Sequence, residues 1–125
     1  MVTGASGFLG RSVCAQLHRE ELVHIGADLR AADPCDVTDR QAVDRLFRTH
    51  RIDTVIHLAA TLPSACRLNP AQATKVNIVG SANLLEAAAQ FGVTGFVFGS
   101  SLSVYGSDLY GAGKRAALPT LIGVK

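Results

Sequence analysis

The sequence predicts an α/β fold, a doubly wound parallel sheet with helices on both faces in three layers. Two observations predict it. Short apolar segments alternate with amphipathic segments along the 125 residues, and strands that are apolar throughout are typical of a parallel sheet covered on both faces. The chain also opens on three regularly spaced glycines, Gly4, Gly7 and Gly10, directly after a short apolar segment. Glycines in this position are typical of the first turn of a nucleotide-binding sheet.

Five apolar segments are expected to be strands. They are residues 1–3, 22–27, 54–58, 95–99 and 120–124. The first of these segments is short. Asp33-Pro34 breaks the chain, so any further strand near these two residues is very short. Right-handed crossovers between successive parallel strands give a Rossmann-like sheet in a single domain, residues 1–125.

Helices are expected between these strands. Residues 11–19 form an amphipathic helix by their apolar spacing. The sequence from Thr38 to Gln41 is a capping-box pattern, with Thr38 as the N-cap of a helix that carries an apolar stripe. Asn69-Pro70 is typical of an N-cap and first helical residue, and Gly92 of a helix end.

Composition excludes several classes of protein. The net charge is +2 and the arginines are scattered, so we expect no nucleic-acid partner. No apolar run is long enough to span a membrane, and no secretory signal pattern opens the chain. Three widely spaced cysteines and four histidines show no metal-ligand spacing. We therefore expect reduced thiols, no metal site and a cytoplasmic location.

The glycine-rich opening predicts a pyrophosphate site. Glycines at this spacing allow a tight turn, a close approach of the backbone to the phosphates, and close packing of the next helix. The N-terminus of that helix presents free N–H groups and the positive end of its dipole. We expect the phosphate-binding residues to be Gly4, Ser6, Gly7, Phe8, Leu9 and Gly10.

Asp28 predicts which dinucleotide binds. It ends the second expected strand, 24 residues after Gly4, where a carboxylate accepts hydrogen bonds from the adenosine ribose and repels a 2′-phosphate. This favours NAD over NADP, although Arg11 or Arg30 is able to meet a 2′-phosphate. Asp36 and Val37 are expected near the adenine, the alternative being that Asp36 only caps a helix.

The strand at 54–58 is followed by small residues. Leu58, Ala59 and Ala60 leave room for a cofactor in the crevice at the carboxyl end of the sheet. His57 belongs to an otherwise apolar strand, so we interpret it as a buried, hydrogen-bonded structural group rather than as an acid or base.

Ser101, Tyr110 and Lys114 are the candidate catalytic residues. On a helix, Tyr110 and Lys114 share one face because they are four positions apart. A nearby ammonium and an oxidised nicotinamide stabilise a phenolate, so we expect them to lower the pKa of Tyr110 toward a range suited to a general base for an alcohol that is being oxidised. Tyr110 and Lys114 also belong to the expected cofactor contacts.

Together these motifs resemble the extended short-chain dehydrogenase/reductase family of NAD-dependent nucleotide-sugar epimerases, dehydratases and reductases. The resemblance implies that Ser101 orients the substrate hydroxyl, Tyr110 exchanges a proton and Lys114 holds the nicotinamide ribose. It adds Asn77, mostly structural, to the cofactor site. The implied activity is hydride transfer at a carbon of a nucleotide-linked sugar, and a homodimer is one assembly that the resemblance allows.

The sequence departs from that family in four ways. The first strand is short, and Ser101 and Tyr110 are only nine positions apart. Leu118 comes only four positions after Lys114, where a long helix is expected, and the C-terminal substrate domain is absent. A shortened or fragmentary form of a longer enzyme, disordered segments missing from this sequence, and a degenerate relative with true deletions each explain this. We therefore expect little turnover from this chain alone and exposed apolar surface that promotes self-association. The alternative function is a non-catalytic NAD(P)-binding module or inactive fragment.

Overall fold

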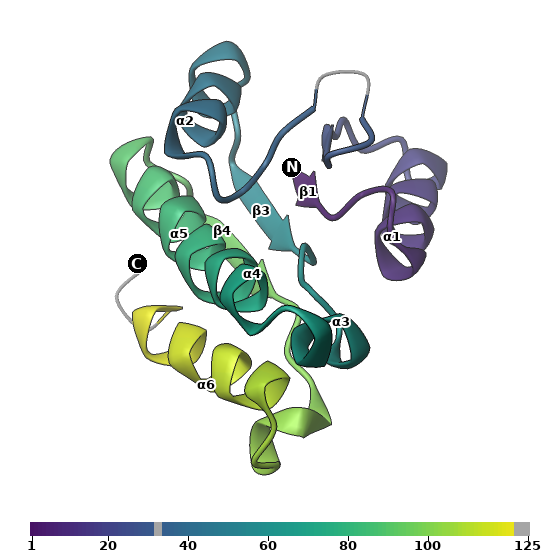
Figure 1. The fold of residues 1–125 in the computed structure, drawn as a ribbon. Helices are drawn as coiled ribbons and strands as arrows, with labels where there is room; N and C mark the ends of the chain where they lie inside the picture. The colour runs from purple at the N-terminus through teal and green to yellow at the C-terminus, as the bar shows by residue number, and fades with distance from the viewer. Residues whose placement is uncertain (32–33, 122–125) are drawn as a thin grey trace.

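The computed structural model describes residues 1–31 and 34–121, and the side chains of that part up to residue 117. Four parallel strands form one sheet in the order β2-β1-β3-β4 (Figure 1). The strands are β1 (Val2–Thr3), β2 (Gly26–Ala27), β3 (Thr54–His57) and β4 (Gly95–Phe98). The chain moves outward from β1 to β2 and then returns past β1 to β3, so the order reverses between β1 and β3.

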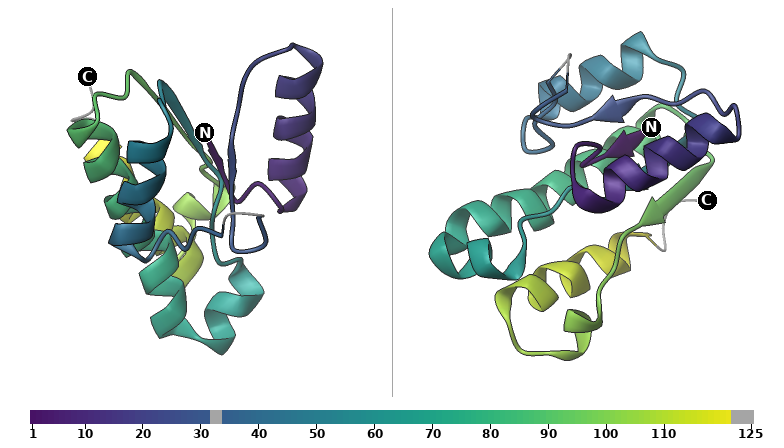
Figure 2. Two further views of the ribbon diagram at one scale, coloured as in Figure 1. Left: turned by 90° about the horizontal axis from the view of Figure 1, so that it is seen from above. Right: turned by 90° about the vertical axis from the view of Figure 1, so that its right-hand side faces the viewer.

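Helices cover both faces of this sheet. They are α1 (Phe8–Arg19), α2 (Arg40–Thr49), α3 (Pro63–Leu68), α4 (Pro70–Thr74), the π-helical segment η1 (Lys75–Gly80), α5 (Ser81–Gln90), the 3₁₀ segment η2 (Leu102–Tyr105) and α6 (Leu109–Leu121). Figure 2 shows α1 on one face and α2, α5 and α6 on the other. The predicted doubly wound, three-layer α/β architecture is thereby confirmed.

Two of the strand predictions are wrong. Of the segment 22–27, only Gly26–Ala27 pairs, because β1 starts at Val2 and its register places Val2 opposite Gly26. Residues 22–25 therefore extend past the start of β1. The strand expected at 120–124 does not form where the structure describes it, since 120 and 121 belong to α6, and 122–124 lie outside the described residues. Pro34 is in no strand, and Asp33 lies outside the described residues.

Helix α2 begins one residue later than the capping-box pattern predicts. Asp39, not Thr38, is the N-cap, and its carboxylate accepts hydrogen bonds from the backbone N–H groups of Gln41 and Ala42 at 2.9 and 3.2 Å. The Thr38 N–H instead donates to Asp36 at 2.8 Å. A carboxylate is available immediately after Thr38, and an anionic acceptor also interacts favourably with the helix dipole.

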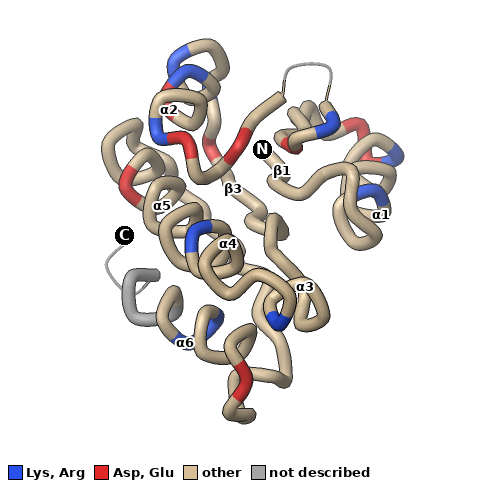
Figure 3. The backbone as a smooth tube through the Cα atoms, viewed as in Figure 1, with Lys and Arg blue, Asp and Glu red and all other residues tan. Residues whose placement is uncertain are grey.

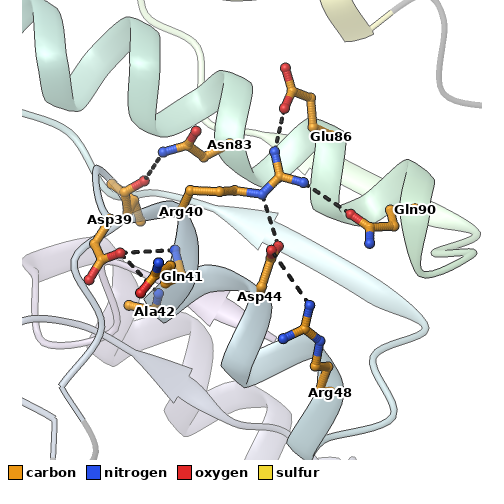
Figure 4. A network of polar contacts seen from close by, with 10 residues as sticks. Asp39, Arg40, Gln41, Ala42, Asp44, Arg48, Asn83, Glu86 and Gln90 are labelled. Atoms are coloured by element: carbon orange, nitrogen blue, oxygen red, sulfur yellow. Dashed lines mark hydrogen bonds and ion pairs between the residues drawn. The ribbon is translucent and has the colours of Figure 1, made fainter.

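The main core lies between the sheet, α2 and α5. The apolar stripe of α2 is buried there, and its side chains meet strand residues such as Val55 and helix residues such as Leu84. At the surface, Arg40 joins the two helices. Its guanidinium contacts Asp44 at 2.9 Å on its own helix, and Glu86 and Gln90 on α5, the latter at 3.0 Å (Figure 4).

The segment that follows Asn69 is one long helical stretch in three parts, α4, η1 and α5. The Asn69 side chain caps it by accepting the Gln72 N–H at 3.0 Å. The chain leaves α5 at Gly92, which has a φ of +71°, a conformation that favours glycine. Both predicted ends are thus confirmed, and the π-helical part, with one extra residue in its turn, is a feature that the sequence pattern did not indicate.

The helix that carries Tyr110 and Lys114 is longer than expected. The spacing of only four positions from Lys114 to Leu118 predicted too little chain for a full helix, but α6 extends over 13 residues and includes Leu118 and Pro119. This expectation was wrong because the helix continues through the apolar segment that was taken for a strand.

Charged residues are spread over several helices (Figure 3). The basic side chains of α1, α2 and α6 are separated from one another rather than gathered along one element. In the part of the chain that the structure describes, no helix is long and apolar enough to cross a membrane. No group of three or more potential metal ligands occurs among those residues.

Candidate active site

A cavity of about 560 Å³ opens at the carboxyl ends of β1, β2 and β3. A second cavity of about 520 Å³ lies at the opposite ends of the strands, near Met1 and Thr54, so size does not distinguish the two. In open α/β sheets, ligands bind outside the carboxyl ends of the strands where the strand order reverses, and here that point lies between β1 and β3. The first cavity is therefore the candidate site.

The glycine loop forms one side of this cavity. Gly4 has a φ of +66°, and a Cβ atom there would lie 2.7 Å from the backbone nitrogen of Ala59. A Cβ atom on Gly10 would collide with the carbonyl oxygen of Gly4. Only glycine lets the loop pass this close to the end of β3 and to the first turn of α1. The N-terminus of α1 consequently borders the cavity, as an anion site requires.

Asp28 ties the end of β2 to the glycine loop. Its carboxylate accepts the backbone N–H of Ser6 at 3.1 Å and that of Arg30 at 3.0 Å. Asp28 lines the cavity, whereas Ser6 and Arg30 do not. Arg11 donates to the Ser6 carbonyl at 2.8 Å, so its guanidinium also braces the loop. Among the described residues, the charged groups that line the cavity are the carboxylates of Asp28 and Asp36, and Asp36 follows Cys35, whose N–H donates to the Asp28 carbonyl at 3.1 Å.

The Asp36–Val37 wall is held from behind by the helix η1–α5. The Val37 carbonyl accepts the Asn83 side-chain amide at 2.9 Å (Figure 4). A Cβ atom on Gly80 would lie 2.6 Å from Cγ2 of Val37. The glycine thus lets the helix approach this wall closely, and the Asn83 amide holds the wall against the helix through its hydrogen bond to Val37.

The third wall is the segment after β3, Leu58–Leu62. Asn77 holds this segment at Thr61. The Asn77 amide oxygen accepts the Thr61 N–H at 2.8 Å, and the amide nitrogen donates to the Thr61 carbonyl at 3.0 Å. Asn77 is buried and does not itself line the cavity. Its position fits the structural role that the resemblance implies for it.

Tyr110, Lys114 and Ser101 come together beside this wall. Tyr110 packs in a buried cluster with Cys66 and Ala73, against which Ala60 of the cavity wall also packs. The Ser101 side chain lies close enough to Tyr110 to lower the pKa of its phenol. The Lys114 Nζ atom lies 5.7 Å from the centre of the Tyr110 ring. The three predicted catalytic residues are therefore neighbours, and Ala60 connects them to the cavity.

Lys114 is buried, with 3% of its surface exposed. Its ammonium donates to the Gly99 carbonyl at 2.6 Å and lies 4.5 Å above the centre of the Phe98 ring. Burial lowers the pKa of Lys114 from its ordinary value. The carbonyl and the aromatic face compensate part of the cost of burying the cation.

The protein's own groups raise the pKa of Tyr110, so the lowering predicted for Lys114 and an oxidised nicotinamide does not come from the protein alone. Burial is the largest cause, the nearby Cys66 thiol and Asp108 also raise it, and only the hydrogen bond with Ser101 lowers it. The pKa rises because loss of hydration disfavours the phenolate by more than its polar neighbours stabilise it.

His57 is the buried structural group that the sequence predicted. Its Nδ1 atom lies 2.7 Å from Thr3 Oγ1, and its Nε2 atom 2.9 Å from Ser81 Oγ. Burial, with a smaller contribution from Lys114, lowers its pKa to about 3. The ring is therefore neutral at neutral pH.

Most of the predicted cofactor residues line the cavity. Those that do are Gly4, Gly7, Phe8, Leu9, Gly10, Asp28, Asp36, Val37, Leu58, Ala59 and Ala60. Those that do not are Ser6, Arg30, Asn77, Tyr110 and Lys114.

Sequence reasoning missed seven residues that line the cavity. They are Ala27, Leu29, Cys35, Thr61, Leu62, Gln72 and Val76. Thr61 and Leu62 directly continue the small residues after β3, so extending that segment by two positions would have found them. Gln72 and Val76 lie on α4 and η1, and nothing in the sequence indicates which face of that helix meets the cavity.

Residues 1–119 match the model of the NAD dependent epimerase/dehydratase family. The chain belongs to this family. The chain is 33% identical to a UDP-glucuronate 4-epimerase of Thermodesulfobacterium geofontis, over 84% of this chain and 40% of the relative. It is 34% identical to a UDP-glucose 4-epimerase of Halalkalibacterium halodurans, over 87% of this chain and 36% of the relative.

Solved structures of family members share the fold. A UDP-glucose 4-epimerase of Thermotoga maritima with UDP-glucose superposes with a TM-score of 0.90 at 27% identity, over 97% of this chain and 49% of that one. A UDP-glucose 4-epimerase of Thermus thermophilus in complex with NAD gives 0.86 at 26% identity, again over 97% and 49%. The chain thus spans less than half the length of these relatives.

Proposed function

We propose that this chain is the NAD-binding domain of an enzyme that acts on a nucleotide-linked sugar by hydride transfer, as an epimerase, dehydratase or reductase. One observation carries the proposal. The cavity formed by the glycine loop, Asp28 and the end of β3 shares a wall residue, Ala60, with the cluster that contains Tyr110. A dinucleotide site and an acid–base group are therefore adjacent.

The residues present fit a bound NAD. The loop from Gly4 to Gly10 and the N-terminus of α1 would hold the pyrophosphate. Asp28 would accept hydrogen bonds from the adenosine ribose, and Asp36 and Val37 would border the adenine. The volume, about 560 Å³, falls in the range of roughly 300–1,000 Å³ found for ligand pockets. Because both charged groups that line the cavity in the described part of the chain are carboxylates, a 2′-phosphate is disfavoured and NAD is preferred to NADP.

Tyr110 is proposed as the group that takes a proton from the sugar hydroxyl and returns it. Ser101, close to Tyr110, orients that hydroxyl, and the Lys114 ammonium, near the Tyr110 ring, holds the nicotinamide ribose. When bound, NAD⁺ supplies the hydride acceptor and a positive charge close to the phenol. A bound cation of this kind opposes the effect of burial on the Tyr110 pKa.

The substrate class is proposed from the relatives. Both curated relatives named above are 4-epimerases of UDP-sugars, and one structural neighbour contains UDP-glucose. Their shared substrate chemistry is a sugar joined to a nucleoside diphosphate. The chain covers less than half of these proteins.

A second candidate is a module that binds NAD(P) without catalysis. The chain spans less than half the length of its relatives, which favours this alternative. Positioning a sugar near the nicotinamide contributes much of the rate of such enzymes. Under this alternative the cavity binds NAD and the Tyr110 cluster remains unused.

The two candidates are separated by measuring turnover and binding in one preparation. The protein is incubated with NAD and a panel of UDP-sugars and dTDP-sugars, and the formation of reduced nicotinamide and of epimerised sugar is followed by absorbance and chromatography. Turnover abolished by Tyr110→Phe, with NAD affinity retained, supports the enzyme. Binding of NAD without any turnover supports the module.

A further inference from the structure

A buried chain of hydrogen bonds joins two neighbouring strands to a helix at the edge of the candidate site. It connects Thr3 on β1, His57 on β3 and Ser81 at the start of α5, none of them more than 2% exposed. Thr3 Oγ1 is 2.7 Å from His57 Nδ1, and Ser81 Oγ is 2.9 Å from His57 Nε2. Ser81 Oγ continues the chain to the Asn77 carbonyl oxygen, 2.9 Å away.

The direction of every bond in this chain is fixed by its two ends. Thr3 Oγ1 accepts the backbone N–H groups of Leu58 and Ala59, both at 3.2 Å. Its own hydrogen therefore points to His57 Nδ1, which must be the unprotonated ring nitrogen. At the other end, the Ser81 hydroxyl donates to a carbonyl, which can only accept. Ser81 Oγ thus accepts from His57 Nε2–H, and His57 is held as a single neutral tautomer.

The same chain holds both ends of one cavity wall. Leu58 and Ala59 are fixed through their N–H groups on Thr3, and Thr61 is fixed through the Asn77 side-chain amide. Asn77 takes part twice, because its backbone carbonyl ends the chain and its side chain holds Thr61. The wall from Leu58 to Thr61 is therefore coupled, through His57 and Ser81, to the helix η1–α5.

We propose that His57 and Ser81 are positioning residues for the dinucleotide: they hold the wall Leu58–Thr61 at the distance from the glycine loop that the bound cofactor requires. The inference rests on the proposed function, since it concerns the affinity for NAD. Neither residue lines the cavity, so both act through Thr3 and Asn77. Burial keeps the His57 ring neutral, which the direction of the chain requires.

The first test is the tautomer of His57, which is measured without NAD. Long-range ¹H–¹⁵N correlation spectra of the whole chain distinguish the two ring nitrogens, and the spectrum of His57→Asn assigns the signal among the four histidines. The expected result is a proton on Nε2 alone at neutral pH. In Ser81→Ala, which removes the acceptor of that proton, Thr3 still donates to Nδ1, so the proton should stay on Nε2 while its signal shifts. A wild-type proton on Nδ1, or a mixture, overturns the hydrogen-bond chain.

The second test is the affinity for NAD, measured by calorimetry at a temperature where each variant is folded. Ser81→Ala and Thr3→Val should each weaken NAD binding about ten-fold, corresponding to roughly 1.4 kcal/mol. Thr3→Ser keeps the hydroxyl and should restore both the affinity and the tautomer. The matched control is Thr49→Val on α2, since the Thr49 hydroxyl also bonds to the carbonyl four residues earlier, at 2.8 Å, but is exposed.

Folded Ser81→Ala that binds NAD as the wild type does overturns the positioning role. If Thr3→Val fails to fold, the NAD affinity of Ser81→Ala still tests the positioning role. A wild type that shows the Nε2 tautomer but binds no NAD contradicts the proposed function, and the positioning role with it, while leaving the hydrogen-bond chain established. The two failures are therefore distinguishable.

Discussion

The carboxylate of Asp28 accepts the backbone N–H of Ser6 at 3.1 Å, joining the end of β2 to the glycine loop. One side chain thus fixes the shape of the loop and also presents its remaining acceptor sites to the cavity that it lines. Loop geometry and the choice between the two dinucleotides consequently depend on the same group.

Asp28→Asn is expected to weaken NAD binding about ten-fold or more, since hydrogen bonds to a charged group contribute roughly 1.5–3 kcal/mol each. The discrimination against NADP should also fall, because a negative charge that repels the 2′-phosphate is removed. Titration calorimetry with both dinucleotides measures the two effects. Asp53→Asn is the control, as Asp53 is exposed and lies near the second cavity. Unchanged affinity for NAD in Asp28→Asn would exclude the assigned role.

Stability is expected to decrease as the pH falls from 6.5 toward about 3, because His57 stays neutral in the folded state while the unfolded chain binds a proton. The contribution is at most about 1.4 kcal/mol per pH unit in this window and is absent above it. Urea denaturation across this pH range measures it. His57→Gln should be less stable at neutral pH but should show a flatter pH dependence. Equal slopes for the two proteins would contradict the buried, neutral ring.

The phenol of Tyr110 is expected to ionise above its ordinary pKa of 10.0, because burial is the largest influence on it. Ultraviolet titration of Tyr105→Phe observes Tyr110 alone, since the chain has two tyrosines. Saturation with NAD⁺ should lower the pKa of Tyr110 through the positive nicotinamide ring. A phenol that titrates below 10 without NAD would contradict the burial described for the site.

Arg40→Ala should lower the free energy of unfolding by about 0.5–1 kcal/mol, the usual range for an exposed ion-pair contact of good geometry. The loss arises because Arg40 contacts α5 through Glu86 and Gln90 (Figure 4). Urea denaturation measures it. Arg51→Ala, which removes an exposed pair with Asp53 at 3.6 Å, should have no measurable effect. A larger loss for Arg51→Ala than for Arg40→Ala would be inconsistent with this account.

The chain is expected to self-associate at micromolar concentration and above, because large apolar side chains are exposed at several places. Val97 on β4 is 54% exposed, and Leu102 and Tyr105 on η2 are 85% and 88% exposed. Surfaces of this kind promote association. Sedimentation velocity over a concentration series measures it, and Val97→Thr together with Leu102→Ser should reduce it. A protein that stays monomeric over the whole concentration series would show that these residues do not cause self-association.

The sequence predicted the fold and the cavity well because both depend on local rules. Gly4 and Gly10 indicate a turn in which a Cβ atom does not fit, and the structure places both at close backbone contacts. The small residues Ala59 and Ala60 indicated where a strand ends at a crevice. These signals were readable without knowing which segments lie side by side.

What the sequence did not predict depends on contacts between distant segments. The short β2 follows from the register with β1, and the raised pKa of Tyr110 follows from burial against Cys66 and Ala73. Ser81 carries no motif, yet its hydroxyl completes the environment of His57. Such partners are set by tertiary packing, which outweighs local propensity.

The central claim is that the cavity at the carboxyl end of the sheet binds NAD, and titration calorimetry of the folded 125-residue chain with NAD and with NADP tests it most directly. The result expected is saturable binding of one NAD per chain, tighter than that of NADP, and abolished by Gly10→Val, whose side chain would occupy the space of the Gly4 carbonyl. A folded chain that binds neither dinucleotide, or that binds NADP more tightly, would contradict the claim.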